Sequence, residues 1–80
     1  MNAGDLIASF RGDAYSLRDQ QLLQALAKLK NGEDPEQVLT LFAHSLTNKL
    51  LHKPTVNLRQ AASDEKMDLL MLTKELYELE

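Results

Sequence analysis

The sequence predicts a small all-α domain, and three observations support that prediction. Leucine and other strong helix formers dominate the chain, whereas β-branched residues are few. Apolar residues recur at the three- and four-residue spacing of helix faces. The length of 80 residues is enough for one domain and too short for two, so residues 1–80 are expected to form a single helical domain.

A first, long helix is predicted from about Gly4 to Lys30. It is expected to end at Asn31-Gly32, because glycine suits the left-handed conformation that closes many helices. Such a helix spans about 40 Å, whereas a compact globule of this chain length is only about 30 Å across. One end of the helix is therefore expected to project beyond the domain.

The apolar stripe of this first helix changes face halfway along. Leu17 and Leu22 are five residues apart in the sequence, which corresponds to about 140° around a helix. The second half is expected to pack inside the domain through three leucines, namely Leu22, Leu26 and Leu29. The first half is expected to pack on a different body through Ile7, Phe10, Ala14 and Leu17.

A second helix is predicted to begin at Asp34, a good N-cap, with Pro35 at the first helical position and Gln37 completing a capping box. Pro54 is expected to end it, because the residue before a proline is disfavoured in helical geometry. A short segment then leads to Ser63, which is expected to cap a last helix. The chain thus has about three helices after the first. The expected buried face of the second helix comprises Val38, Leu41, Phe42, Leu46 and Leu50.

The apolar arc of the last helix is too broad for a helix with one neighbour, so packing on two sides is expected. A chain this short buries only about 60–65% of the surface that its unfolded form exposes. Without cysteine, neither disulfides nor a thiolate zinc site can add stability. The sequence therefore favours association with a partner, most simply a second copy of the chain.

Charge is distributed unevenly along the chain. The net charge of −3 gives no electrostatic reason to bind nucleic acid. Residues 37–63 carry Lys49, Lys53 and Arg59 and no acidic residue, whereas residues 64–80 carry two basic and six acidic residues. These blocks are either ordinary solvated helix faces or a basic middle that meets an acidic tail, within or between chains.

The sequence contains no recognisable catalytic, cofactor-binding or metal site. It has no glycine-rich phosphate loop, no dinucleotide fingerprint and no cysteine nucleophile. His44 and His52 are eight residues apart, so they do not form the pair of a helical metal site. No apolar run approaches the roughly 20 residues that span a bilayer, and a soluble cytoplasmic protein is expected.

Thr47 and Asn48 lie among leucines in the interior of the predicted second helix, where such side chains compete with backbone hydrogen bonds. They indicate specific hydrogen bonds at a packed interface, or else they are two ordinary exposed polar residues. The stretch from Ala43 to Thr55 that contains them resembles the signature of the C-terminal dimerisation domain of bacterial glutamyl-tRNA reductase. The resemblance extends to residues 7–11, 25–35 and 58–62 and to the acidic, leucine-rich tail, and it departs from the signature at Lys53, where a small residue is expected.

The resemblance implies a homodimerisation module within a larger enzyme. That enzyme would use NADPH to reduce glutamate attached to its transfer RNA, giving glutamate-1-semialdehyde for tetrapyrrole (haem) biosynthesis. The family's catalytic cysteine and dinucleotide-binding loop have no counterpart in this sequence. Catalytic and NADPH-binding domains would lie upstream, joined by a long spinal helix that ends in the first helix of this chain. No cofactor, metal or catalytic residue is then expected in these residues.

On this hypothesis the domain pairs as a helical dimer through an isologous interface, in which the same patch meets itself. The expected interface residues are Leu46, Thr47, Asn48, Leu50, Leu51, Leu69, Leu72 and Leu76. The alternative is a helical binding module for another macromolecule. Lys49, Lys53 and Arg59 would then contact transfer RNA phosphates in the assembled enzyme, or the domain would dock a regulatory protein.

Overall fold

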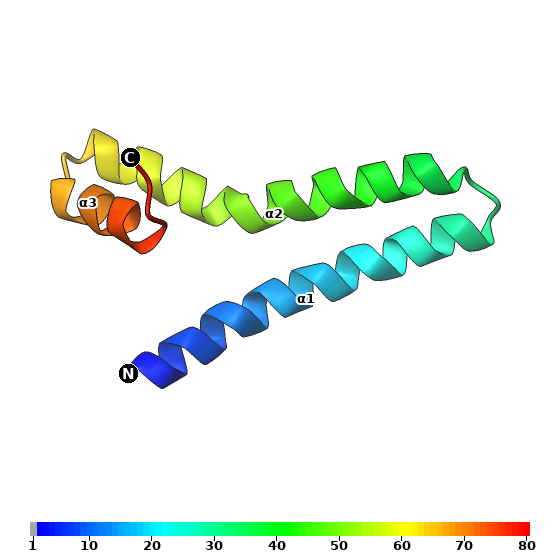
Figure 1. The fold of residues 1–80 in the computed structure, drawn as a ribbon, viewed down its shortest axis with the longest axis horizontal. Helices are drawn as coiled ribbons and strands as arrows, with labels where there is room; N and C mark the ends of the chain where they lie inside the picture. The colour runs from blue at the N-terminus through cyan, green and yellow to red at the C-terminus, as the bar shows by residue number, and fades with distance from the viewer. Residues whose placement is uncertain (1) are drawn as a thin grey trace. The chain divides into compact units, whose positions relative to one another are not determined.

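The structure is a computed structural model that describes residues 2–80. Over this range it contains three α-helices and no strand, namely α1 (Ala3–Lys30), α2 (Pro35–Ser63) and α3 (Met67–Leu76) (Figure 1). The predicted all-α class is confirmed. The chain divides into two compact units, the first extending to Leu50 and the second beginning at Leu51, so that α2 contributes to both.

Both ends of α1 are fixed by local hydrogen bonds. At its start, the backbone N–H of Asp5 donates to Asn2 Oδ1 at 2.8 Å. At its end, Gly32 adopts a φ of 83°, and the N–H of Glu33 donates to the carbonyl oxygen of Lys28 at 3.1 Å. This is the Schellman arrangement, in which the residue in the left-handed conformation returns the chain to the last helical turn. The predicted extent of the first helix is confirmed.

The start of α2 is also confirmed. The side chain of Asp34 caps the helix, because its Oδ2 accepts the backbone N–H of Gln37 at 3.0 Å. The carbonyl oxygen of Asp34 accepts the first intrahelical bond, from the N–H of Val38 at 2.9 Å. Pro35 occupies the first helical position, where its missing N–H has no intrahelical partner to lose.

The prediction that Pro54 ends the second helix is wrong. α2 continues through Pro54 to Ser63, so two helices follow the first rather than about three. The φ of proline is compatible with helical geometry, so the helix continues, although the hydrogen bond to the carbonyl oxygen of Leu50 is lost and the proline ring crowds that carbonyl. Helical turns on both sides of the proline maintain the helix across this position. The two compact units meet in sequence at the same turn, between Leu50 and Leu51.

The predicted cap of the last helix is wrong as well. Ser63 is the last residue of α2, and α3 begins only at Met67, with no side-chain hydrogen bond at its N-cap. The intervening residues close α2 instead, because the N–H of Lys66 donates to the carbonyl oxygen of Ala61 at 2.8 Å. Glu65 takes the left-handed position of this closure, with a φ of 56°.

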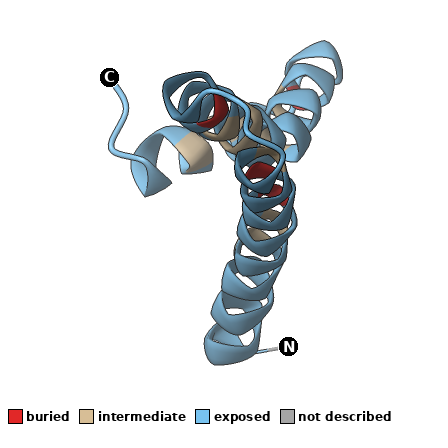
Figure 2. Ribbon diagram, turned by 90° about the vertical axis from the view of Figure 1, so that its right-hand side faces the viewer, coloured by how far each residue is buried: buried red, intermediate tan, exposed pale blue. Residues whose placement is uncertain are grey.

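The first unit is a hairpin of α1 and the first half of α2 (Figure 1), and most of its residues are exposed (Figure 2). Its buried residues are Gln21, Ala25 and Val38. The predicted packing of Leu22, Leu26 and Leu29 is wrong, because these side chains remain 36–43% exposed. Leu41 and Leu50 are also exposed, whereas Val38 is buried and Phe42 and Leu46 are half-buried as predicted.

The packed face of α1 explains this difference. Half-buried Ala14 and Leu17 are followed by buried Gln21 and Ala25, which continue the same face at spacings of three and four residues. The stripe therefore does not change face at Leu22. The small side chain of Ala25 allows α2 to approach closely, and the three leucines lie beside this contact instead of inside it.

The second unit packs the last turns of α2 against α3. Ala61 is its most buried residue, with 2% exposure. Pro54 and Leu58 of α2 and Leu70 and Thr73 of α3 are half-buried, and they form the packed face of this unit. α3 itself has no fully buried residue.

Candidate association surfaces

The signature segment of α2 presents most of its side chains to solvent. Leu46 is half-buried, whereas Leu50 and Leu51 are 39% and 55% exposed. Thr47 and Asn48 are exposed as well. This segment therefore carries apolar surface that its own helix does not cover. Removing leucine side chains from water lowers the free energy, so burial of this surface against another body would be favourable.

The hydroxyl of Thr47 is satisfied within α2. It donates to the carbonyl oxygen of Ala43, one turn earlier, at 2.8 Å, and Thr73 makes the same bond to Leu69 in α3. This back-bonding is one way in which threonine is accommodated in a helix interior. The hydroxyl oxygen of Thr47 retains acceptor capacity for a further partner.

The outward side of α3 is a second exposed apolar surface. Leu69, Leu72 and Leu76 are 43%, 61% and 77% exposed. Met67 and Met71 are each 60% exposed. The broad apolar arc of this helix thus faces α2 on one side only, and the expected second packing partner is not supplied by the described residues of the second unit.

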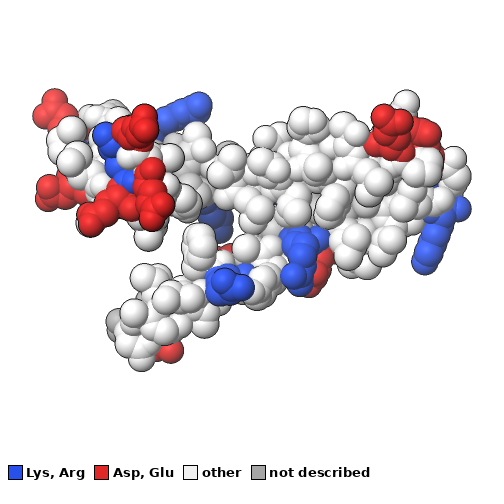
Figure 3. Space-filling view, in the orientation of Figure 1, with Lys and Arg blue, Asp and Glu red and all other residues white. Residues whose placement is uncertain are grey.

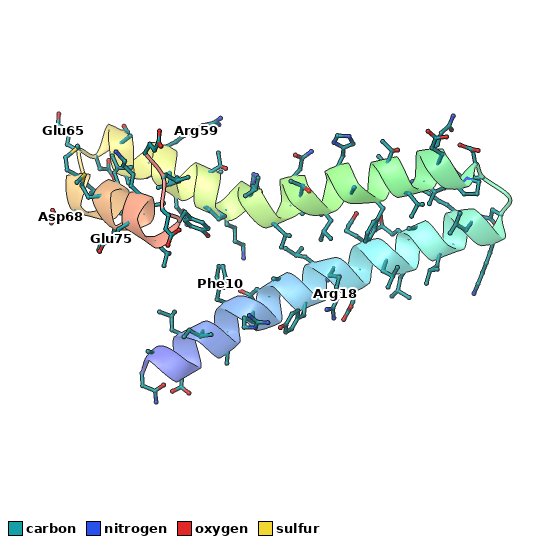
Figure 4. All side chains as sticks on the ribbon, in the orientation of Figure 1. Phe10, Arg18, Arg59, Glu65, Asp68 and Glu75 are labelled. Atoms are coloured by element: carbon teal, nitrogen blue, oxygen red, sulfur yellow. The ribbon has the colours of Figure 1, made fainter. Side chains whose placement is uncertain are left out.

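The first three turns of α1 are exposed on all sides. Every residue from 3 to 13 is solvent-exposed, and Phe10, which stands out from the helix in Figure 4, is 63% exposed. This agrees with the expectation that one end of the first helix projects from its hairpin.

A cation–π cluster further along α1 was not predicted from the sequence. The guanidinium carbons of Arg11 and Arg18 lie 5.4 and 4.9 Å from the centre of the Tyr15 ring. Arg18 Nε also pairs with Asp19 Oδ1 at 2.9 Å, and this hydrogen bond raises the pKa of the guanidinium. The spacing of Arg11 and Arg18 from Tyr15, four and three residues, is the signal that could have revealed it. The cluster stabilises the exposed face of α1.

The basic and acidic blocks keep most of their charge unpaired. The Arg18–Asp19 pair is the only ion pair among residues 2–80. Lys49, Lys53 and Arg59, the predicted phosphate contacts, are exposed and belong to no ion pair in that range. Carboxylates gather over α3 and the residues that follow it (Figure 3).

Over the described part of the chain, no group of three or more His, Cys, Asp or Glu side chains is placed to hold a metal ion. None of the three helices combines the length and the hydropathy needed to cross a bilayer.

The fold and these exposed surfaces define a small helical association domain. Comparison with known proteins specifies the class further. The chain belongs to the family described as glutamyl-tRNAGlu reductase, dimerisation domain, whose sequence model matches residues 1–79. The resemblance noted from the signature is thereby confirmed, and the match covers nearly the whole chain.

Individual relatives support the same assignment. A glutamyl-tRNA reductase of Coxiella burnetii (strain Dugway 5J108-111) is 51% identical over 77 residues, which cover 96% of this chain and 19% of the relative. One of Chromohalobacter salexigens is 50% identical over 68 residues, 85% of this chain and 16% of the relative. One of Pseudomonas aeruginosa (strain PAO1) is 40% identical over 78 residues, 98% of this chain and 18% of the relative.

The chain therefore spans about a fifth of the length of the curated relatives that it matches. No solved structure matched it.

Proposed function

We propose that this chain holds two copies of a longer protein together as a homodimer. The family assignment supports this proposal, and the exposure of α3 carries it. A helix in which three of the leucines, Leu69, Leu72 and Leu76, remain 43–77% exposed gains stability when a second body covers it. A chain of 80 residues has little core of its own, so the apolar surface buried against a second copy adds stability that the monomer lacks.

The proposed interface combines the two exposed surfaces described above. Its residues are Leu46, Thr47, Asn48, Leu50 and Leu51 of α2 and Leu69, Leu72 and Leu76 of α3. Thr47 would use its remaining acceptor capacity at this contact, since its own proton is already donated to Ala43.

For the longer protein we propose the activity that the names of the relatives state, reduction of glutamyl-tRNA. NADPH would supply the reducing equivalents, and glutamate-1-semialdehyde would enter tetrapyrrole biosynthesis. The catalytic residues and the NADPH site would lie in domains outside residues 1–80.

The solution mass of the chain tests self-association directly. Light scattering on a sizing column, at several protein concentrations and two salt concentrations, is expected to give a species of twice the 9.0 kDa chain mass. Apolar packing predicts a mass that changes little with salt, because salt screens only charge interactions. A folded monomer at every concentration would overturn the proposal.

A matched pair of variants tests the interface. Leu50→Asp is expected to give a monomer, or to unfold the chain if folding and dimerisation are coupled, because it places a charge in the apolar contact. Leu39→Asp makes the same change at another exposed leucine of α2 that lies outside the proposed interface, and it is expected to remain dimeric. An unchanged dimer in the Leu50 variant would remove that residue from the interface.

A further inference from the structure

α3 and the residues that follow it form a shallow, open groove that both apolar and charged side chains line. The groove has a volume of about 720 Å³. Met71, Leu72 and Leu79 line it with apolar atoms. Its charged lining residues are Asp68, Glu75, Glu78 and Lys74. Three carboxylates and one ammonium give it a net charge of −2 (+1 − 3).

The α2 residues of the same unit do not cover this groove. α3 packs on α2 through half-buried Leu70 and Thr73. Leu72 and Glu75 follow these two residues by two positions each, and therefore lie about 200° around the helix from them. Figure 4 shows Asp68 and Glu75 on the side of α3 that is turned away from α2. An occupant of the groove has to come from elsewhere.

The charge pattern of the chain indicates what that occupant is. Lys49 and Lys53 are four residues apart on α2, within the stretch 37–63 that contains no acidic residue. Their combined charge of +2 matches the −2 of the groove. Both are exposed, and neither forms an ion pair among residues 2–80. Lysine also has a long methylene stem, which can cover the apolar side chains of the groove while the ammonium group reaches one of its carboxylates.

We propose that the α3 groove of one chain receives the Lys49–Lys53 turn of α2 from a second copy. Two-fold symmetry repeats this contact, since each chain carries both a groove and a lysine turn. The inference rests on the proposed homodimer and goes beyond it by specifying which parts meet and in which register. The apolar leucine contacts provide the bulk of the association, and the charged contacts select the register, as complementary charges do at other interfaces.

A charge-reversal experiment on the whole 80-residue chain tests this register. The first variant combines Lys49→Glu with Lys53→Glu, and the second combines Glu75→Lys with Glu78→Lys. Asp68 is left unchanged, because it lies in the first turn of α3, where an acidic residue favours the helix. Far-UV circular dichroism establishes that each variant is helical, and sedimentation equilibrium at low salt gives the dissociation constant.

Each variant alone is expected to dissociate at least about tenfold more readily than the unmodified chain, because both of its symmetric contacts become like-charged. An equimolar mixture of the two variants is expected to form a heterodimer, in which both contacts are again of opposite charge. High salt should reduce the difference between the separate variants and the mixture. If mixing restores the dimer, the loss of dimer in the separate variants is due to their charges, because variants that had lost their fold would not dimerise when mixed.

A control of equal charge separates specific pairing from overall repulsion. Lys30→Glu with Arg59→Glu lowers the net charge by the same amount as the first variant, at exposed residues outside the Lys49–Lys53 turn. It is expected to dimerise like the unmodified chain.

Two results would overturn the inference while leaving the homodimer itself intact. One is that both double variants remain as dimeric as the control, which would leave Lys49 and Lys53 available for phosphate contacts. The other is that both variants become monomeric and the mixture also stays monomeric. A monomeric unmodified chain would instead defeat the proposed function from which the inference starts.

Discussion

Pro54 lies four residues after Leu50 within the continuous helix α2, so the carbonyl oxygen of Leu50 lacks the backbone N–H that would normally bond to it. The division between the two compact units falls immediately after Leu50. The proline thus interrupts the hydrogen-bond ladder of the helix at the junction of the units.

Replacing this proline with alanine is expected to stabilise the chain. Pro54→Ala restores the N–H and removes an intrinsic helix penalty of about 3 kcal/mol. It also increases the conformational entropy of the unfolded chain, which offsets about 0.4–1 kcal/mol of the gain. A net increase of about 2 kcal/mol in the free energy of unfolding should appear in urea titrations followed by circular dichroism. Thr55→Ala, at an exposed neighbouring position of α2, serves as the control, and equal stability of the two variants would contradict the expectation.

Glu65 is expected to be replaceable by glycine with a gain in stability. Its φ of 56° is costly for a residue with a Cβ atom and costs glycine little, so Glu65→Gly should raise the free energy of unfolding by about 1 kcal/mol. Glu75→Gly makes the same change inside α3 and should lower it by about 1 kcal/mol. Thermal unfolding at one fixed protein concentration measures both. Effects of the same sign would show that position 65 does not favour glycine.

The cap at Asp34 is expected to contribute measurably to stability. Asp34→Ala removes the acceptor of the Gln37 N–H and should lower the free energy of unfolding by about 1 kcal/mol. Glu33→Ala changes a neighbouring exposed acid whose side chain makes no hydrogen bond in the described range, and it should have an effect within about 0.5 kcal/mol of zero. Chemical denaturation distinguishes the two, and equal losses would argue against the cap.

The close contact at Ala25 can be tested by adding volume. Ala25 is 8% exposed, and Ala25→Leu should overfill the contact between α1 and the first half of α2, at a loss of about 1–3 kcal/mol. Ala27→Leu places the same side chain at an exposed position two residues later and should be nearly neutral. If the face of Leu22 and Leu26 were the packed one, as the sequence pattern suggested, Ala25→Leu would be tolerated.

The ends of the elements that follow from local chemistry were predictable from the sequence. Asp34 with Pro35 starts α2, and Gly32 ends α1, because a cap or a left-handed turn needs only residues within one helical turn. The family could also be predicted from the sequence, because the signature from Leu46 to Pro54 is a contiguous run of residues.

Other features depended on residues that are distant in the sequence, and only the tertiary structure decided them. Local rules place a helix end before Pro54, yet α2 is continuous to Ser63, and half-buried Pro54 and Leu58 lie on the face of α2 that packs in the second unit. Hydrophobicity favours Leu22 as a buried residue, yet Gln21 and Ala25 are buried, because the way in which two helices cross decides which face of α1 meets α2. The α3 groove likewise depends on the fold, because Glu78 and Leu79, which follow the helix, line it together with residues of α3.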